Sequence, residues 1–323
     1  MKKVLWSLMD NRRGSVGQAL GIIEALDENL FDVEQKQLEY NTFSGLPNFI
    51  RGRSLLGITK ESGSQITAPF PDYVLSISRR TLPVARYIKK LSPKTKIVQL
   101  MYPGKTGLND CDLVIVPKHD ENKAKGKNIY YIVGCAHRIT EEFLQKEREK
   151  WQDTFANLPK PLTAVIVGGA IKNKPFSEEN ALALGQAVKN LKNKIGGSIL
   201  ITTSRRTGEA AQKIIMEQIK DIPQHTFLWG DKGENPYGGY LACADNLVVT
   251  GDSVSMCCEA TGTGKPLWVF TGENWLTEKH LRFVNSLYEG KYAVALNDEK
   301  AFDFNPQKSL NASVEVAELI KKL

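Results

Sequence analysis

The amino-acid sequence predicts an α/β protein made of two doubly wound parallel-sheet domains. Short apolar stretches typical of buried strands alternate with amphipathic helical stretches along almost the whole chain. A polar helical stretch that ends at Pro159 and Pro161 interrupts this alternation, which then begins again. A chain of 323 residues is also long enough for two domains that each bury a core.

The first half of the chain predicts one such domain, over residues 1–155. Pro83 lies near enough to the start of its helix to be tolerated. Residues 41–68 contain Gly, Pro and a basic RGR stretch, and we expect a loop with a short helix there. The predicted strands are 2–9, 32–40, 71–78, 96–102, 111–117 and 129–134, and the predicted helices are 14–28 and 80–92.

The second half predicts a further domain, over residues 156–309, and a final helix within 310–323 that could pack back on the first domain. In doubly wound domains, functional residues lie at the carboxyl ends of the strands, and we expect them in a crevice that faces the other domain. The predicted strands are 162–169, 197–204, 225–230, 246–251 and 266–270, and the predicted helices are 140–161, 177–192, 208–221, 235–245, 253–261 and 313–323.

The net charge of +7 fits either a polyanionic partner or simply a lysine-rich surface. The partner could be nucleic acid, an anionic membrane face or a diphosphate substrate. No stretch interleaves basic and aromatic residues, which disfavours nucleic acid. No apolar stretch reaches transmembrane length, and the N-terminal one is too short for a signal peptide. We therefore expect a cytoplasmic protein, with contact to the inner membrane surface left open.

The five cysteines form no CxxC pair and no zinc spacing, and their number is odd. We interpret them as small core residues in a reducing compartment, with no metal and no disulfide.

The stretch GTGKP at residues 262–266 resembles a phosphate-binding P-loop but fails its pattern. Glu259 stands where the first glycine is required, and Pro266 follows Lys265 in place of Ser or Thr. The stretch also precedes a predicted strand, whereas a P-loop follows one. We predict a helix-ending turn here. A dinucleotide-binding GxGxxG after the first strand is missing as well, which disfavours an NAD domain.

The helix predicted over 253–261 has two chemically different faces. At about 100° per residue, Asp252, Ser255, Met256 and Glu259 share one arc, and the opposite arc is small and apolar. Asp252 or Ser253 would cap the helix, and its N-terminal N–H groups attract phosphate. A carboxylate two turns later suits the hydroxyls of a ribose. The alternative is an ordinary capped helix with a solvated glutamate.

Three other strand ends of the second domain carry polar or glycine features. Two glycines, Gly168 and Gly169, allow close backbone approach, and two guanidiniums, Arg205 and Arg206, suit a diphosphate unless they belong to an exposed basic turn. Aromatic and backbone groups at another strand end could hold a base. The residues concerned are Gly168, Gly169, Thr203, Ser204, Arg205, Arg206, Trp229, Asn235, Pro236 and Tyr237.

The first domain offers candidates for an acceptor-activating base. Asp10 ends the first strand, and His119 and His137 follow later strands. Each histidine could equally be structural. A base of this kind would have to face a bound acceptor.

Taken together, these stretches resemble the mitochondrial-fission (elongated-mitochondria) family, whose bacterial members are described as glycosyltransferases of GT-B type. The resemblance runs from about residue 4 to 275 and is carried by DNRRGSVGQALGI, PDYVLSISRRT, DLVIVPKHD, VGCAHRIT, VIVGG, TTSRRT, NPYGGYLACAD and VTGDSVSMCCEATGTGKPLWVF. It implies a GT-B fold, two Rossmann-like domains with a cleft between them. A more remote similarity to the lipid-linked N-acetylglucosamine transferase of peptidoglycan synthesis implies that Glu259 binds ribose.

Our leading hypothesis is a GT-B glycosyltransferase that moves a sugar from a nucleotide diphosphate to an acceptor hydroxyl, such as that of a cell-envelope glycolipid or lipopolysaccharide. Glu259 would hold the ribose, and Asp10 or His119 would deprotonate the acceptor. No DxD motif ends a strand, so we expect neither metal nor cofactor. A nucleotide-sugar epimerase and a non-catalytic membrane-associated scaffold remain alternatives. The diphosphate would be bound by Thr203, Ser204, Arg206, Ser253 and Ser255, and the base by Trp229 and Asn235 to Tyr237.

Overall fold

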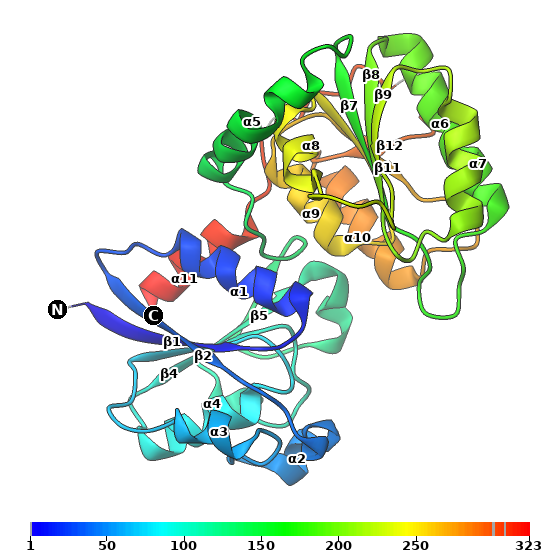
Figure 1. Cartoon of the computed structure of the whole chain (residues 1–323). Coiled ribbons are helices and arrows are strands. Elements are labelled where there is room, and N and C mark those ends of the chain that lie inside the picture. The colour runs from blue at the N-terminus through cyan, green and yellow to red at the C-terminus, as the bar shows by residue number, and fades with distance from the viewer. Residues whose placement is uncertain (1, 299–300, 307) are drawn as a thin grey trace. The chain divides into compact units, whose positions relative to one another are not determined.

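The structure is a computed structural model that describes residues 2–298, 301–306 and 308–323. The chain divides into two compact units (Figure 1). Unit 1 combines Met1–Arg138 with Ala312–Leu323, and unit 2 is Ile139–Asn311. Each unit contains one parallel six-stranded sheet with helices on both faces, so the predicted α/β fold class is confirmed.

The sheet of unit 1 has the order β2-β1-β3-β4-β5-β6. Its strands are β1 (Lys3–Met9), β2 (Phe31–Gln37), β3 (Tyr73–Ser76), β4 (Lys96–Leu100), β5 (Leu113–Pro117) and β6 (Ile129–Ile132). Its helices are α1 (Arg13–Ala25), α2 (Asn48–Arg51), α3 (Lys60–Ser64), α4 (Leu82–Leu91) and α11 (Ala312–Lys322), with short 3-10 turns η1 (Thr42–Gly45), η2 (Leu108–Asp110) and η3 (Lys118–Lys123).

Both faces of this sheet are buried because alternate residues of each strand point to opposite sides. Leu5 and Met9 of β1 pack on the side of α1 and α11, whereas Trp6 and Leu8 pack on the side of α4. Figure 1 shows α1 and α11 on one side of the sheet and α2, α3 and α4 on the other. The covering helices explain why the central strands β3, β4 and β5 are nearly continuous apolar runs, whereas the edge strand β2 is mostly polar.

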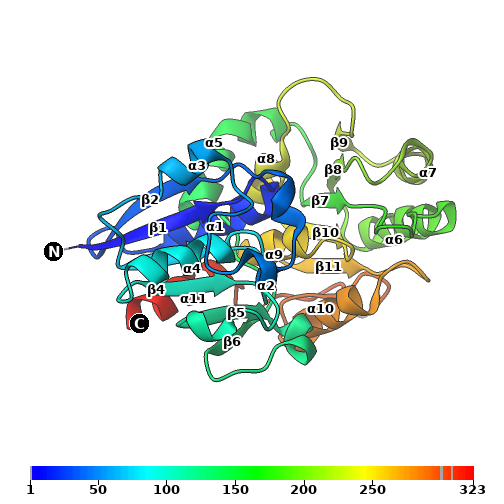
Figure 2. The same cartoon turned by 90° about the horizontal axis from the view of Figure 1, so that it is seen from below.

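The sheet of unit 2 has the order β9-β8-β7-β10-β11-β12. Figure 2 shows the strands β9 to β11 in this order, with α6 and α7 together on one face. The strands are β7 (Leu162–Val167), β8 (Ser198–Thr203), β9 (Gln224–Phe227), β10 (Asn246–Thr250), β11 (Leu267–Phe270) and β12 (Val294–Ala295). The helices are α5 (Glu141–Phe155), α6 (Glu178–Ile195), α7 (Glu209–Ile219), α8 (Tyr237–Cys243), α9 (Val254–Gly262) and α10 (Glu278–Glu289).

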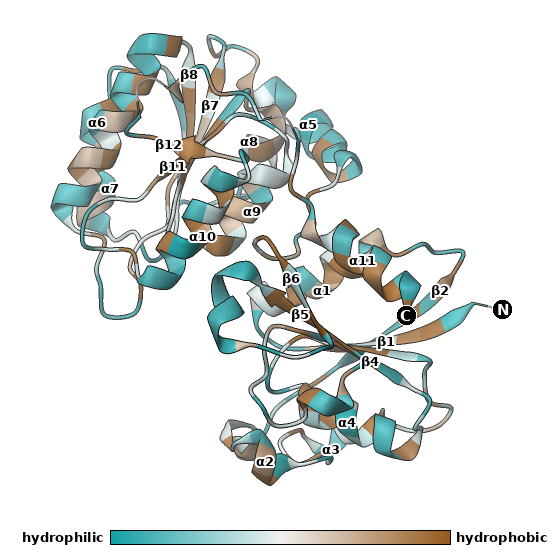
Figure 3. Cartoon of the chain, turned by 180° about the vertical axis from the view of Figure 1, so that it is seen from behind, coloured by the Kyte–Doolittle hydropathy of each residue, from teal (hydrophilic) through white to brown (hydrophobic). Residues whose placement is uncertain are grey.

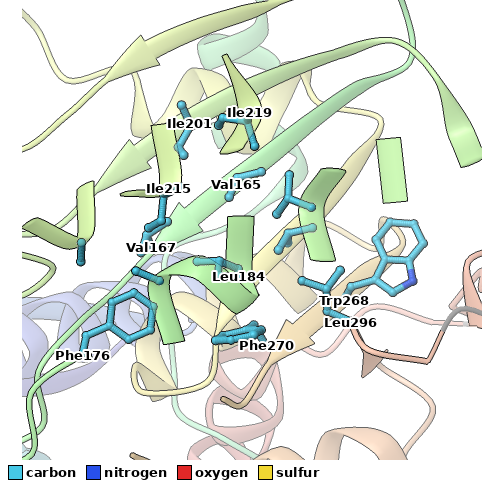
Figure 4. Close-up of a cluster of buried hydrophobic side chains, with 14 of the residues drawn as sticks. Val165, Val167, Phe176, Leu184, Ile201, Ile215, Ile219, Trp268, Phe270 and Leu296 are labelled. Atoms are coloured by element: carbon cyan, nitrogen blue, oxygen red, sulfur yellow. The ribbon is translucent and has the colours of Figure 1, made fainter. Parts of the chain in front are cut away.

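The core under α6 and α7 holds the sheet of unit 2 to these two helices (Figure 4). Val165 and Ile201 of the strands meet Leu184 of α6 and Ile215 of α7, all at most 1% exposed. Burying an aliphatic side chain of this size contributes about 1.5–3 kcal/mol. Figure 3 shows hydrophobic and hydrophilic residues in turn along α6 and α7, as expected for helices with one buried face. The core therefore fixes the strand ends that carry the polar residues described below.

The structure differs from the sequence prediction at three elements. Helix α5, which we had placed in a first domain over 1–155, packs on unit 2: Phe155 contacts His225 and Tyr240, with ring centroids 5.1 and 5.6 Å away. Helix α10 and strand β12 were not predicted, because the helix begins with polar residues and the strand has only two residues. The final helix is not one of these differences: the sequence left its packing on the first domain open, and α11 packs on α1 in unit 1, where Ser313 Oγ bonds the backbone of His137.

Within the described residues, no helix has the length and apolar character needed to cross a membrane.

Candidate functional site

The strand order of unit 2 reverses direction between β7 and β10. Ligands of doubly wound sheets bind outside the carboxyl ends of the two strands at such a point, because the connecting segments leave there in opposite directions. Gly168 and Gly169 follow β7, and Gly251 to Ser253 follow β10. The sequence features that we singled out at these two strand ends therefore meet at the position where this fold class places its ligand.

Asp252 connects the strand ends at this point. Its side chain is fully buried, and its two carboxylate oxygens accept hydrogen bonds from Thr250 Oγ1 at 2.7 Å and from the Gly169 amide at 2.9 Å. Arg206 Nη2 pairs with the same carboxylate at 2.8 Å. Burial raises the pKa of Asp252, and the hydrogen bonds and Arg206 oppose that rise. Asp252 is thus a structural link between loops.

The two glycines after β7 are required by close packing. A Cβ at Gly168 would collide with the Asp252 carboxylate, and a Cβ at Gly169 would collide with the backbone of Arg206. The backbone oxygen of Gly168 accepts a hydrogen bond from Ser204 Oγ at 2.8 Å and another from Thr207. These glycines allow neighbouring loops of the protein to come close to the backbone after β7.

The two arginines after β8 have different surroundings. Arg206 binds Asp252 and donates from Nη1 to the Ala170 oxygen at 2.8 Å, yet 39% of its side chain is exposed. Arg205 is exposed and has no hydrogen-bond or ion-pair partner within the described part of the chain. Arg206 therefore holds the site together, and Arg205 is the guanidinium that is free for a ligand.

The hydroxyls of Thr203 and Ser204 are committed to the protein. Thr203 Oγ1 accepts a bond from the Trp229 amide at 2.8 Å and donates to the Gln212 side chain. Ser204 Oγ donates to Gly168 and accepts a bond from the Arg206 amide at 3.2 Å. Both residues shape the loop that follows β8, and their binding to a diphosphate stays a prediction.

Helix α9 begins directly after the Asp252 link. Ser253 is its N-cap and accepts a bond from the Met256 amide at 3.4 Å, so the cap is Ser253 and not Asp252. Ser255 and Met256 are half-buried, whereas Cys257 and Cys258 are buried against the sheet. The first-turn N–H groups of α9 therefore lie at the switch point, where they favour an anion.

Glu259 lies in the second turn of α9 and is held by Tyr237. The Tyr237 hydroxyl donates a short hydrogen bond to Glu259 Oε2. Burial raises the pKa of Glu259, and the bond from Tyr237 opposes that rise. Burial and the neighbouring carboxylate raise the pKa of Tyr237 well above its ordinary value. The pair presents a fixed carboxylate on the half-buried face of α9, which rules out a freely solvated glutamate.

The predicted base-binding residues lie on the segment between β9 and α8. Trp229 is 58% exposed, and its backbone amide is anchored on Thr203. Asn235 is exposed and accepts a bond from the Tyr237 amide at 3.0 Å through Oδ1, and Pro236 is buried. Trp229 is thus an exposed ring on a fixed backbone, whereas Asn235 and Pro236 set the start of α8.

Three residues of the site escaped the sequence prediction. Thr250 donates to Asp252 and accepts a bond from the Gly168 amide at 2.7 Å. Trp275 donates from Nε1 to the Gly169 oxygen at 3.2 Å, and His280 lies beside Asp252, with a pKa lowered by burial. Thr250 adjoins the GDS stretch and could have been suspected from the sequence. The other two come from a region where α10 was not predicted.

The GTGKP stretch is a turn that ends α9, as predicted, with Gly264 at φ +69°. Its lysine has a structural role: Lys265 Nζ donates to the Leu241 and Ala242 oxygens, both at 2.8 Å, at the end of α8. Burial lowers the pKa of Lys265 to about 8. Within the described ranges, no group of three or more His, Cys, Asp or Glu side chains could hold a metal ion.

The residues that we predicted as a catalytic base lie in unit 1, where both are buried. Asp10 is 1% exposed and pairs with Arg80, whose Nη2 also donates to Asn11 Oδ1 at 2.6 Å. His119 is the second residue of η3, after β5, with Nε2 3.7 Å from the Asp120 carboxylate. In this conformation, an acceptor hydroxyl could reach neither side chain without a rearrangement.

Two Rossmann-like units of this kind define a protein of GT-B fold. The described structure resembles three solved proteins over nearly its whole length. The first is a candidate UDP-N-acetylglucosamine 2-epimerase from Listeria monocytogenes (TM-score 0.59, 12% identity, covering 99% of this chain and 95% of that one). The others are the UDP-GlcNAc 2-epimerase of Neisseria meningitidis bound to UDP-GlcNAc (0.52, 15%, 100% of each chain) and a glycosyltransferase from Rickettsia africae ESF-5 (0.52, 13%, 99% and 97%).

The chain belongs to the mitochondrial fission ELM1 family, whose model matches residues 13–323, and the family resemblance of the sequence is thereby confirmed. It is 30% identical to the uncharacterised protein RP120 of Rickettsia prowazekii (strain Madrid E), over 98% of this chain and 97% of that protein. It is 32% identical to the mitochondrial fission protein ELM1 of Arabidopsis thaliana, over 68% of this chain and 56% of the plant protein.

Proposed function

We propose that unit 2 binds a nucleotide-diphosphate sugar and that the protein is a glycosyltransferase. The observation that carries the proposal is the Glu259–Tyr237 pair, which fixes a carboxylate one to two turns along a helix whose N-terminus lies at the switch point. An anionic diphosphate suits the helix N-terminus, and the ribose hydroxyls suit the carboxylate. The likeness to a UDP-GlcNAc-bound epimerase and to a glycosyltransferase supports this class of ligand.

The contacts within unit 2 suggest a division of roles. The first-turn amides of α9, with Ser253 and Ser255, would receive the diphosphate, together with the exposed Arg205. Arg206, tied to Asp252, would keep the loops in place and add positive charge from its exposed side. Trp229 offers an exposed ring for the base. As the diphosphate leaves, its growing negative charge would be stabilised by the helix N-terminus and by Arg205.

In the proposed transfer, the acceptor hydroxyl attacks the anomeric carbon of the sugar and the bond to the diphosphate breaks. The hydroxyl proton passes to a base, for which Asp10 and His119 remain the predicted groups. The acceptor that we propose is a glycolipid of the cell envelope, and the net charge of +7 would favour an anionic membrane surface.

Replacing Glu259 by Gln tests the donor site. A lost charge-assisted hydrogen bond is worth about 1.5–3 kcal/mol, so the Kd for UDP-GlcNAc or UDP should rise about 10- to 100-fold. Isothermal titration calorimetry on the full chain measures this change. Glu217→Gln is the matched control, because Glu217 is an exposed carboxylate on α7 that pairs only with Lys220. Equal affinities for the wild type and the Glu259 variant would refute the role of Glu259.

An epimerase is the second candidate, because the described fold also resembles two UDP-GlcNAc 2-epimerases. Incubating the protein with UDP-GlcNAc in D2O, with no acceptor, separates the two activities. An epimerase would produce the C2 epimer with deuterium at C2, whereas a transferase would give slow hydrolysis without exchange. A protein that shows neither reaction and no nucleotide affinity would be a scaffold.

A further inference from the structure

Unit 1 contains a cluster of buried polar atoms without partners. In this cluster, six side-chain atoms are covered by protein yet make no hydrogen bond to any residue that the structure describes: Asp10 Oδ2, Tyr40 OH, Asn48 Nδ2 and Oδ1, Arg51 Nη1 and Arg80 Nε. Buried polar groups in folded proteins are nearly always paired, so each exception needs an explanation. A functional site that awaits its ligand is one such explanation.

The five residues form one cluster at the switch point of unit 1, where the strand order β2-β1-β3 reverses between β1 and β3. Asp10 follows β1, and Arg80 lies in the loop after β3. The Arg80 guanidinium lies 4.1 Å from the centroid of the Tyr40 ring. Arg51 Nη2 donates to the Arg80 oxygen at 2.8 Å, and Asn48 precedes Arg51 by one turn of α2.

Arg51 is a buried charge without a counter-ion. Its side chain is among the largest fully buried ones, at 1% exposure, and its hydrogen bonds go to the backbone oxygens of Leu56 (3.0 Å) and Arg80 (2.8 Å). No carboxylate pairs with it in the described part of the chain, since Asp10 already pairs with Arg80. Gly57, at φ +108°, leaves no room for a Cβ beside the Arg51 guanidinium.

The positive charge of this cluster exceeds its negative charge. Arg79 lies close enough to Arg51 to help lower its pKa, although burial is the larger cause. Arginine is almost never buried without a partner, so the cluster lacks an anion. Its free donors are a guanidinium nitrogen of each arginine, an amide and a phenol. Guanidinium groups make charge-assisted hydrogen bonds to phosphate oxygens, so a phosphate group suits this set of donors.

The outer side of the same segment is apolar. Phe43, Phe49 and Ile50 are 51%, 72% and 51% exposed, on η1 and α2, and brown residues mark α2 in Figure 3. One short segment therefore carries an uncompensated guanidinium inside and aromatic and aliphatic side chains outside. A ligand that satisfies both sides has an anionic group and an apolar chain.

We propose that the cluster of Asp10, Tyr40, Asn48, Arg51 and Arg80 binds the monoprotonated phosphate group of a lipid-like molecule. The free donors of the cluster would bond the phosphate oxygens, and the P–OH of the phosphate would donate to Asp10 Oδ2. The apolar chain would lie against Phe43, Phe49 and Ile50. Because the free donors are covered, the segment 41–59 must shift to admit the phosphate. This segment contains only short helices, and side chains hold it to the rest of unit 1, among them Arg79 Nη1 on the Leu46 oxygen at 2.9 Å and Arg86 Nη1 on the Gly52 oxygen at 2.8 Å. The proposal rests on unit 1 alone and goes beyond the donor site of unit 2.

Calorimetry on the full chain tests the ligand class with three probes: inorganic phosphate, dihexanoyl phosphatidic acid below its aggregation concentration, and dihexanoylglycerol. We expect phosphatidic acid to bind at least about 10-fold more tightly than inorganic phosphate, and dihexanoylglycerol not to bind. Equal binding of the two phosphates would support the anion site and overturn the apolar contact. No binding of either phosphate up to about 10 mM would overturn the proposal.

Tyr40→Phe is the sharpest variant, because it removes only a hydroxyl that has no partner in the structure. The Tm should stay unchanged while the affinity for both phosphates falls about 10-fold, an effect of the size expected for one hydrogen bond. Arg51→Gln should abolish phosphate binding. Tyr87→Phe, on α4 of the same unit, is the control that should change neither. Unchanged phosphate affinity in Tyr40→Phe and Arg51→Gln would place the binding elsewhere and refute the site.

The apolar contact has its own pair of variants. Phe49→Ser should weaken phosphatidic acid binding and leave inorganic phosphate binding unchanged, whereas Leu182→Ser, at a 45% exposed position of unit 2, should affect neither. Equal phosphatidic acid affinity in the wild type and in Phe49→Ser would refute the contact. Titrating UDP into the same variants keeps the two proposals apart, because a failed donor site removes UDP binding without affecting the phosphate result.

Discussion

Each unit holds a buried aspartate at the point where its strand order reverses, and each aspartate pairs with an arginine. In unit 2, both oxygens of Asp252 are used, by Thr250, by the Gly169 amide and by Arg206. In unit 1, Arg80 pairs with one oxygen of Asp10, while the other oxygen has no partner. Both aspartate–arginine pairs lie at a switch point, although Asp10 follows the first strand of its unit and Asp252 follows the fourth, and the two carboxylates are hydrogen-bonded to different degrees.

This difference separates a structural link from a candidate binding site. A fully paired buried carboxylate holds its loops together and has no capacity left for a ligand. A half-paired carboxylate among other unpaired polar atoms is costly until something else completes it. In unit 2, the ligand-facing groups are accordingly the neighbours of the aspartate, namely the α9 N-terminus, Arg205 and Glu259. In unit 1, they include the aspartate itself.

The largest effect is expected from Asp252→Asn. The new amide would point a donor at the Gly169 amide or at Arg206, so that several bonds to one buried carboxylate are lost together, which costs about 3–5 kcal/mol. Urea unfolding of the full chain, followed by circular dichroism, measures the loss. Asp221→Asn, at an exposed position after α7, is the control. A loss below about 1 kcal/mol would end the interpretation of Asp252 as a structural link.

A smaller effect is expected from Asp10→Asn in the same experiment. Only one oxygen of Asp10 is paired, and Arg80 keeps Asn11 and the Tyr40 ring as neighbours. The expected loss is about 1–2 kcal/mol, the size of a hydrogen bond to a charged group. If Asp10→Asn destabilised the protein as much as Asp252→Asn, the contrast between the two switch points would disappear.

The smallest effect on stability is expected from Arg205→Gln. This side chain is exposed and has no described partner, so the free energy of unfolding should change by less than about 0.5 kcal/mol. Nucleotide affinity should nevertheless fall about 10-fold, since a guanidinium that contacts diphosphate is lost. Arg206→Gln should do the reverse: the free energy of unfolding should fall clearly, and nucleotide affinity should change less. Equal changes in stability and in nucleotide affinity for the two variants would refute the different roles of Arg205 and Arg206.

Much of the fold could be predicted because its signals are local. Apolar runs of strand length, the polar helix before Pro159 and the glycines after β7 all appear within short windows of sequence. The prediction failed for α10, where the apolar face is narrow and the first turn is polar. It also placed α5 in the wrong unit, because a mostly polar helix does not show which core it covers.

The sequence predicted which strand ends form the candidate site, but it did not predict which side chains contact one another there. The sequence indicated which strand ends carry polar residues, and Glu259, Ser253 and Arg205 keep the surroundings that their proposed roles need. It could not show that Thr203 and Ser204 are turned toward the protein. Arg51, in the basic RGR stretch of a predicted loop, gave no sign that it is fully buried.

The sequence by itself determined the alternation of strands and helices, because the spacing of apolar residues sets which local structure buries them. It also determined that GTGKP cannot be a P-loop, since that motif requires particular residues at fixed positions. Only the tertiary structure decided which polar groups meet. Gly169 and Asp252 are 83 residues apart, and Arg51 and Arg80 are 29 apart. Contacts over such distances follow from strand order and core packing, which no short stretch of sequence specifies.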